Sequence, residues 1–215
     1  MNIIQEINKY LQPDQSRQPA FSPLLLLLLA WPMATIIYGN AIHDDYAFIR
    51  QWDWIQMLWI GISIPLLLFQ EKAGLPHWLG PGIPWNRKWL LPALAGLGFG
   101  LLDVVVIKVI MHPGPYESLP PFLQPFPYSL FLYPSGALDI EIFYRLLPIT
   151  LAAWACKRWA PGIKGQFILW TVVILTSLRE PLEQWPSGPA WFIVYASLSG
   201  FLMNLAQGIC MVRFG

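Results

Sequence analysis

Eight ionisable side chains lie inside long apolar segments of the sequence, where a charge is costly. Glu141 and Arg145 are four residues apart, and Arg179 and Glu183 repeat that spacing in the next apolar segment. Residues four apart share one face of a helix, so each carboxylate is predicted to lie beside its arginine. A charged side chain at the centre of a membrane costs roughly 2.5 to 3.5 kcal/mol on insertion scales, so each one prompts a functional hypothesis. The full set is Asp103, Lys108, Asp139, Glu141, Arg145, Arg179, Glu180 and Glu183.

A carboxylate in such a setting can hold a water molecule or a proton. Peptide hydrolysis needs a base within hydrogen-bonding distance of a water, and donors that stabilise the oxyanion. We predict Glu141 as the base, Arg145 as the side chain that orients it, and Glu183 as a second acid. A substrate site or polar cavity is predicted to include Asp103, Arg179, Glu180 and Asn204. The alternative is an ion-pair network that locks helices together, because buried charges are tolerated when each one is paired.

One stripe of the last apolar segment carries small and polar residues, namely Ser197, Gly200, Asn204 and Gly208. Small residues at this spacing let two membrane helices approach closely. We therefore favour a helix packing face over a substrate contact for this stripe.

Metal and nucleic-acid binding are not indicated. The histidines, His43, His77 and His112, lie outside the apolar segments or at an edge, and Cys156 and Cys210 have no close histidine or cysteine. A histidine-bound zinc site within the membrane is therefore not expected, and we predict neither a metal nor a cofactor. The 13 Lys and Arg against 12 Asp and Glu give a net charge of +1, too little for a nucleic-acid surface.

The composition requires a membrane. Of the 215 residues, 56% are hydrophobic and 12% are charged, whereas globular domains average about 45 to 50% apolar and about 25% charged. A bilayer core of about 30 Å needs about 20 mostly apolar residues per helix. We predict an all-α, multi-pass protein of the cell membrane with about six transmembrane helices. The predicted spans are residues 23–42, 54–69, 89–111, 128–159, 166–184 and 190–212.

The Lys and Arg residues of the connections are distributed unevenly. Short cytoplasmic loops carry the excess of these residues, so both termini are predicted to be cytoplasmic. Arg50 lies on the opposite side. The predicted cytoplasmic cations are Lys9, Arg17, Lys72, Arg87, Lys88, Lys157, Arg158, Lys164 and Arg213.

The chain is predicted to have an N-terminal segment and a single membrane domain. Residues 1–22 contain Ile3, Ile4 and Ile7 at helical spacing before a proline, which is typical of an amphipathic or interfacial helix. A frayed tail is the equally weighted alternative. Residues 23–215 are predicted to form one transmembrane helical domain.

Residues 140–147, with the sequence IEIFYRLL, resemble the first motif of the CPBP family of intramembrane proteases, the CAAX-processing and bacteriocin-processing enzymes. That motif has two adjacent glutamates, three residues that are usually hydrophobic or aromatic, and an arginine. Glu141, the aromatic run and Arg145 match it. Ile140 stands where the family has its first glutamate, which the family uses as the base that activates water.

Two further family motifs are altered or missing. The second motif is a phenylalanine, three residues and a histidine; the corresponding residues 176–184 offer Glu183 or Gln184 where the histidine would fall. The third motif, a histidine followed four residues on by an asparagine or a similar residue, lies in a later helix. Residues 198–215 are similar to the helix that precedes it.

Three functions are compatible with these patterns. The resemblance implies an intramembrane endopeptidase acting on a membrane-associated peptide or protein. Ile140 and the missing histidines imply instead a catalytically inactive member that binds a membrane protein as a scaffold. A small proton-coupled transporter would use Asp103, Glu141 and Glu183. All three have the lipid bilayer as a partner, and none involves nucleic acid.

Overall fold

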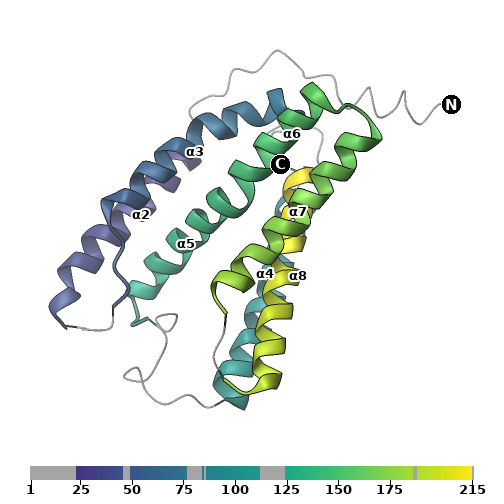
Figure 1. The fold of residues 1–215 in the computed structure, drawn as a ribbon. Helices are drawn as coiled ribbons and strands as arrows, with labels where there is room; N and C mark the ends of the chain where they lie inside the picture. Colours follow the sequence, from purple (N-terminus) through teal and green to yellow (C-terminus); the bar gives the residue numbers. More distant parts are fainter. Residues whose placement is uncertain are drawn as a thin grey trace. The chain divides into compact units, whose positions relative to one another are not determined.

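The computed structural model describes residues 23–45, 49–76, 84, 86–111, 124–185 and 188–214. The segment predicted as an amphipathic helix at residues 1–22 lies outside these ranges. Within them the chain is helical and has no strand, so the predicted all-α class is confirmed (Figure 1).

The helices correspond closely to the six predicted apolar segments. The first two segments form α2 (Pro23–Ala41) and α3 (Trp54–Ala73), and the last two form α7 (Ile163–Glu183) and α8 (Ala190–Phe214). A short 3₁₀ turn, η1 (His43–Asp45), follows α2. The third segment consists of η2 (Asn86–Leu90), α4 (Leu91–Val104) and η3 (Val105–Ile110). The fourth consists of α5 (Tyr128–Ile140), η5 (Glu141–Leu146) and α6 (Leu147–Trp159). The segments η2, η3 and η5 are π-helical.

Helix α3 continues four residues beyond its predicted end at Phe69. The prediction followed hydropathy, but polar residues can extend a helix once its backbone hydrogen bonds are formed. The helix stops at Gly74, whose φ of 86° places it in the left-handed region. There the Leu75 N–H donates to the Gln70 oxygen at 3.0 Å and the Gly74 N–H to the Glu71 oxygen at 3.0 Å, which is the Schellman arrangement of a helix end.

Three helices are long and apolar enough to cross a membrane. By length and composition they are Trp54–Ala73, Leu91–Ile110 and Ala190–Phe214, counted over the described ranges. This supports association with a membrane. The six-span topology and the cytoplasmic termini stay predictions.

The chain forms two compact units. The first contains the described residues within 65–102 and 143–215, and therefore the second half of α3, η2, most of α4, residues 143–146 of η5, α6, α7 and α8. The second contains those within 15–64 and 103–142, and therefore α2, the first half of α3, η3 and α5. A single domain over residues 23–215 stays a prediction.

In the second unit, α2 packs against α5 through a hydrogen-bonded threonine. The Thr35 hydroxyl lies 3.0 Å from the Phe131 carbonyl oxygen, 3.1 Å from the Trp31 carbonyl oxygen and 2.7 Å from the Ser135 hydroxyl. Thr35 and Ser135 are both fully buried. Polar side chains of this kind commonly join apolar helices in membranes.

Thr35→Val is expected to lower the free energy of unfolding by about 1 kcal/mol, because it removes this bridge while nearly keeping the side-chain shape. The matched control is Thr150→Val in α6. Thr150 is also fully buried, but its hydroxyl has no hydrogen-bond partner in the described part of the chain, so we expect a neutral or slightly stabilising change. Denaturant unfolding in mixed micelles, followed by circular dichroism, measures both variants. Equal losses would contradict the assigned bridge.

In the first unit, α7 packs against both α6 and α8. Glycines on α8 allow the close approach: a Cβ atom at Gly208 would lie 3.0 Å from Cγ1 of Val173, and one at Gly200 would lie 3.3 Å from Cγ of Pro181. The predicted packing face is therefore confirmed at these two positions.

Candidate functional site

The segment that resembles the protease motif forms a π-helical turn. Glu141–Leu146 lies between α5 and α6, and Pro148 follows in the first turn of α6. Because proline has no N–H, it removes one hydrogen bond of the regular α-helical pattern and favours a local change of winding. Single π-helical turns occur frequently at functional sites. Glu141 belongs to the second unit and residues 143–146 to the first, so the contacts below are those of the first unit.

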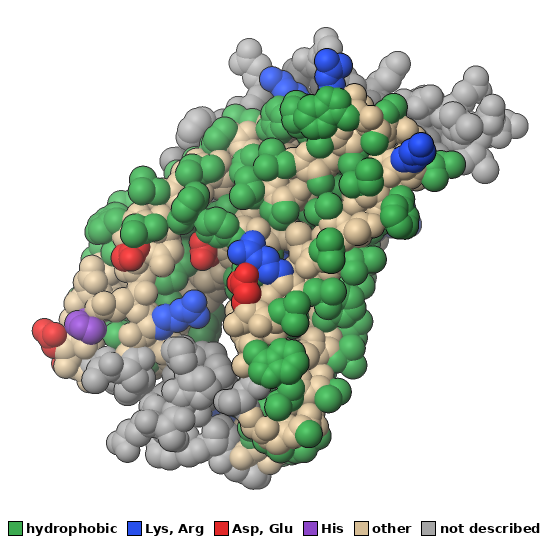
Figure 2. Space-filling model, viewed as in Figure 1, with side chains coloured by type: hydrophobic (Ala, Val, Ile, Leu, Met, Phe, Trp, Pro, Cys, Tyr) green, Lys and Arg blue, Asp and Glu red, His purple; other side chains and the backbone are tan. Residues whose placement is uncertain are grey.

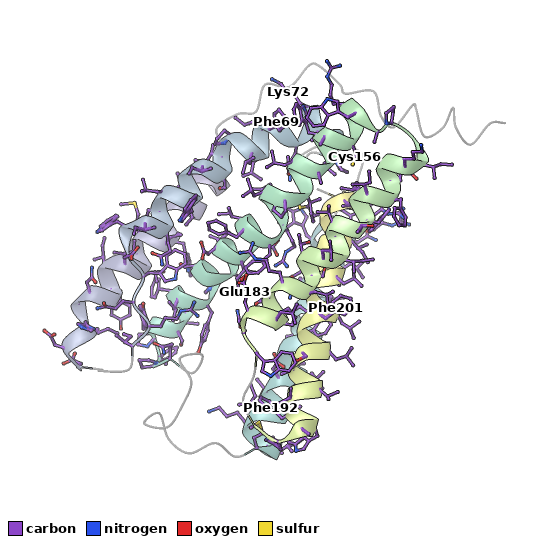
Figure 3. The ribbon with its side chains drawn as sticks, in the orientation of Figure 1. Phe69, Lys72, Cys156, Glu183, Phe192 and Phe201 are labelled. Atoms are coloured by element: carbon purple, nitrogen blue, oxygen red, sulfur yellow. The ribbon has the colours of Figure 1, made fainter. Side chains whose placement is uncertain are left out.

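Tyr144, Arg179 and Glu183 form a polar cluster in the first unit. The Tyr144 hydroxyl donates to Oε2 of Glu183, and Nε of Arg179 donates to Oε1 at 2.7 Å. The Arg179 guanidinium also lies over the Tyr144 ring, 4.6 Å from its centroid. The predicted pairing of Arg179 with Glu183 is therefore confirmed. Both oxygens of the Glu183 carboxylate accept hydrogen bonds. Figure 3 labels Glu183 near the end of α7.

This cluster is open on one side. The side chains of Arg179 and Glu183 are 48% and 47% exposed, although they bond to each other. Nη1 of Arg179 lies 3.5 Å from the Phe143 carbonyl oxygen, at the limit of a hydrogen bond. A guanidinium with this exposure can still donate to a carbonyl oxygen or an anion.

Arg145 makes a second, buried connection. Its side chain is 3% exposed, and its Nη1 donates to Oδ1 of Asn204, which is fully buried on α8. Nδ2 of Asn204 donates in turn to the Gly200 carbonyl oxygen at 2.8 Å. Two adjacent residues of η5 are thus each held by a polar side chain of another helix, Tyr144 by α7 and Arg145 by α8.

Asn204→Leu is expected to lower the free energy of unfolding by about 2 kcal/mol, because it takes an acceptor from a buried guanidinium. Gln207→Leu is the matched control on the same helix. Its Oε1 is buried without a hydrogen-bond partner among the described residues, so its loss should be neutral or stabilising. The free energy of unfolding of both variants is measured in mixed micelles with a thiol-reactive dye. The dye labels the buried Cys156 when the first unit unfolds. An Asn204 variant as stable as the control would contradict the assignment.

The other predicted site residues are distributed over both units. Glu180 accepts a hydrogen bond from Nε2 of Gln184 at 3.3 Å, while its Oε2 is buried and lacks a partner in the described ranges. Glu141 is half-buried and Asp103 is exposed, and both belong to the second unit. One site that combines Asp103, Glu141 and Glu183 therefore stays a prediction.

The sequence reasoning missed two contacts of this site. Tyr144 was one of the aromatic residues of the motif, but nothing marked it as the partner of Glu183. Asn204 was predicted at a site or a packing face, but not as the partner of Arg145. Residue pairs separated by 39 and 59 positions leave no periodic signal in a sequence.

Chemically, the first unit offers hydrogen-bond donors beside a carboxylate. Arg179 and Tyr144 supply the donors, and Glu183 supplies the negative charge that orients them. Within the described ranges, no group of three or more His, Cys, Asp or Glu side chains is arranged to hold a metal ion.

Comparison with known proteins adds no relative to this description. No protein-family model, no curated protein and no solved structure matches the chain. The resemblance of residues 140–147 to the CPBP motif stays a prediction.

Proposed function

We propose that the chain is a CPBP-like intramembrane peptidase that cleaves a membrane-associated peptide or protein. The observation that carries this proposal is that residues of the motif are hydrogen-bonded to two other helices. Tyr144 and Arg145 lie inside the π-helical turn, and each bonds to a polar side chain of a different helix. Such anchoring holds a catalytic segment in one geometry, as hydrolysis at membrane depth requires.

In this proposal the six apolar segments all span the membrane, with both termini in the cytoplasm. The agreement between the helix bounds and the predicted spans supports the six-span arrangement. The uneven distribution of Lys and Arg supports the orientation.

The reaction assigns one role to each polar side chain. Glu141 takes a proton from a water, whose oxygen attacks the carbonyl carbon of the peptide bond, and the proton passes to the leaving amine. Its spacing of four residues from Glu141 in the sequence assigns Arg145 to orient that carboxylate. Glu183, predicted as a second acid, already accepts two hydrogen bonds, which supports a role in positioning Arg179 and Tyr144.

The second candidate is a catalytically inactive scaffold that binds a membrane protein. Two observations support it. Ile140 occupies the position at which the family has its first glutamate, and Arg145 and Glu183 already form hydrogen bonds within the chain. A network of this kind can serve helix packing alone.

One experiment separates the two candidates. The full chain is reconstituted in liposomes with a library of membrane-anchored peptides, and new peptide termini are identified by mass spectrometry. Cleavage by the wild type that disappears in the Glu141→Gln variant supports the peptidase. A wild type that cleaves nothing, yet retains a stoichiometric membrane protein through purification, supports the scaffold. Cleavage that survives in the variant contradicts Glu141 as the base.

A further inference from the structure

The turn between α6 and α7 exposes apolar side chains to an unusual degree. Helix α6 ends at Trp159 and α7 begins at Ile163. Among the described residues of the first unit, the most exposed large apolar side chains are Ile163 at 86%, Phe167 at 74% and Trp159 at 70%. All three belong to this one turn and the helix ends beside it.

Cations flank the same turn. Lys157 and Arg158 precede it and Lys164 follows it, and all three are exposed. None of them forms an ion pair within the part of the chain that the structure describes. Apolar side chains framed by unpaired cations are typical of a surface that lies at the boundary between lipid headgroups and acyl chains.

Two contacts bring further cations to this end of the first unit. Nζ of Lys157 donates to the Lys72 carbonyl oxygen at 3.1 Å, which places the end of α3 beside the end of α6. The Arg213 guanidinium lies 5.8 Å from the centroid of the Trp170 ring, which places the end of α8 beside the beginning of α7. Figure 3 shows Lys72 at the same end of the unit as Cys156 of α6.

Aromatic side chains pack against one another at this end. Trp154 and Trp159 pack edge to face with their ring centroids 5.2 Å apart, and Phe69 of α3 lies 6.1 Å from Trp154. Tryptophan prefers the membrane interface because its ring is apolar and its N–H is polar. Figure 2 shows Lys and Arg side chains beside apolar ones near the α6–α7 turn.

We propose that this end of the first unit is a binding site for an anionic phospholipid. Arg158 and Lys164 contact the headgroup phosphate, and Trp159, Ile163 and Phe167 pack against the upper part of the acyl chains. Charge complementarity favours an anionic lipid over a zwitterionic one, and the exposed apolar residues favour a lipid over a soluble acidic protein. Lys157, whose amine is engaged by the Lys72 carbonyl, serves to hold α3 at the site.

The test uses the full chain in maltoside micelles, titrated with dioctanoyl phosphatidylglycerol or dioctanoyl phosphatidylcholine and observed by native mass spectrometry. We expect phosphatidylglycerol to bind more tightly, and the double variant Arg158→Gln/Lys164→Gln to weaken that binding roughly 30-fold. The charge-matched control is Arg50→Gln/Lys108→Gln, which should bind as the wild type does.

A charge-preserving swap, Arg158→Lys/Lys164→Arg, separates lost charge from a disturbed fold and should keep most of the affinity. Equal affinity for the two lipids would overturn the proposal, as would undiminished phosphatidylglycerol binding by the double Gln variant. An equal loss of phosphatidylglycerol affinity in the control variant would also overturn the proposal, because the lipid would then respond only to the net charge of the protein. Release of the lipid by inorganic phosphate at equal concentration would show a free-phosphate site instead.

Discussion

Replacement of Glu141 by glutamine is expected to slow peptide cleavage by about 10²- to 10⁴-fold, the usual contribution of a positioned general base. Glutamine keeps the size and the hydrogen-bonding capacity of the side chain but cannot accept a proton from water at neutral pH. Initial rates on a cleaved reporter peptide, measured in liposomes at several substrate concentrations, give kcat and KM separately. The loss should appear in kcat, because Glu141 acts on the water and not on the binding of the peptide.

The matched control is Glu71→Gln, the same change at an exposed glutamate near the end of α3. Its rate should equal that of the wild type. A fall in rate for both variants would indicate a general effect of lost negative charge. A higher KM with an unchanged kcat for Glu141→Gln would assign this residue to substrate recognition and remove it as the base.

Replacement of Gly165 by alanine is expected to lower the free energy of unfolding by about 3 kcal/mol. Gly165 is buried in the first turn of α7, where the chain has just reversed direction after α6. A Cβ atom there would lie 2.1 Å from the backbone oxygen of Ala160 and 3.2 Å from Cβ of Cys156. A backbone atom cannot yield as the tip of a side chain can, so the turn must change its conformation.

Cys156 reports this change directly, because it is buried and adjacent to Gly165. The rate at which a thiol-reactive dye labels it should rise, and the unfolding midpoint should fall. Gly96→Ala and Gly98→Ala in α4 are the controls. No atom lies within 4 Å of a Cβ at either position, so alanine should be neutral or should stabilise the helix by up to about 1 kcal/mol. A Gly165 variant as stable as these would contradict the close approach.

The sequence alone was sufficient to locate the helices. The predicted segment 128–159 coincides with the run from α5 through η5 to α6, and the last segment begins at Ala190 as predicted. The reason is local: a long apolar run must satisfy its own backbone hydrogen bonds when water is excluded, and a helix does so within the segment. The errors are at the ends. Polar residues at the end of α3 extend the helix where hydropathy has already fallen.

The pairing of Arg179 with Glu183 was also predictable from the sequence, because spacing by four on one helix leaves a definite pattern. The bonds of Tyr144 to Glu183 and of Arg145 to Asn204 were not. Helical periodicity determines which residues share a face, but it contains no information on which face of another helix lies opposite. That choice depends on close packing between helices, as where Gly208 lets α8 approach Val173 of α7. The sequence by itself thus determined the helices, the charges they carry and the pairing within one helix, and only the tertiary structure decided which side chains of other helices those charges meet.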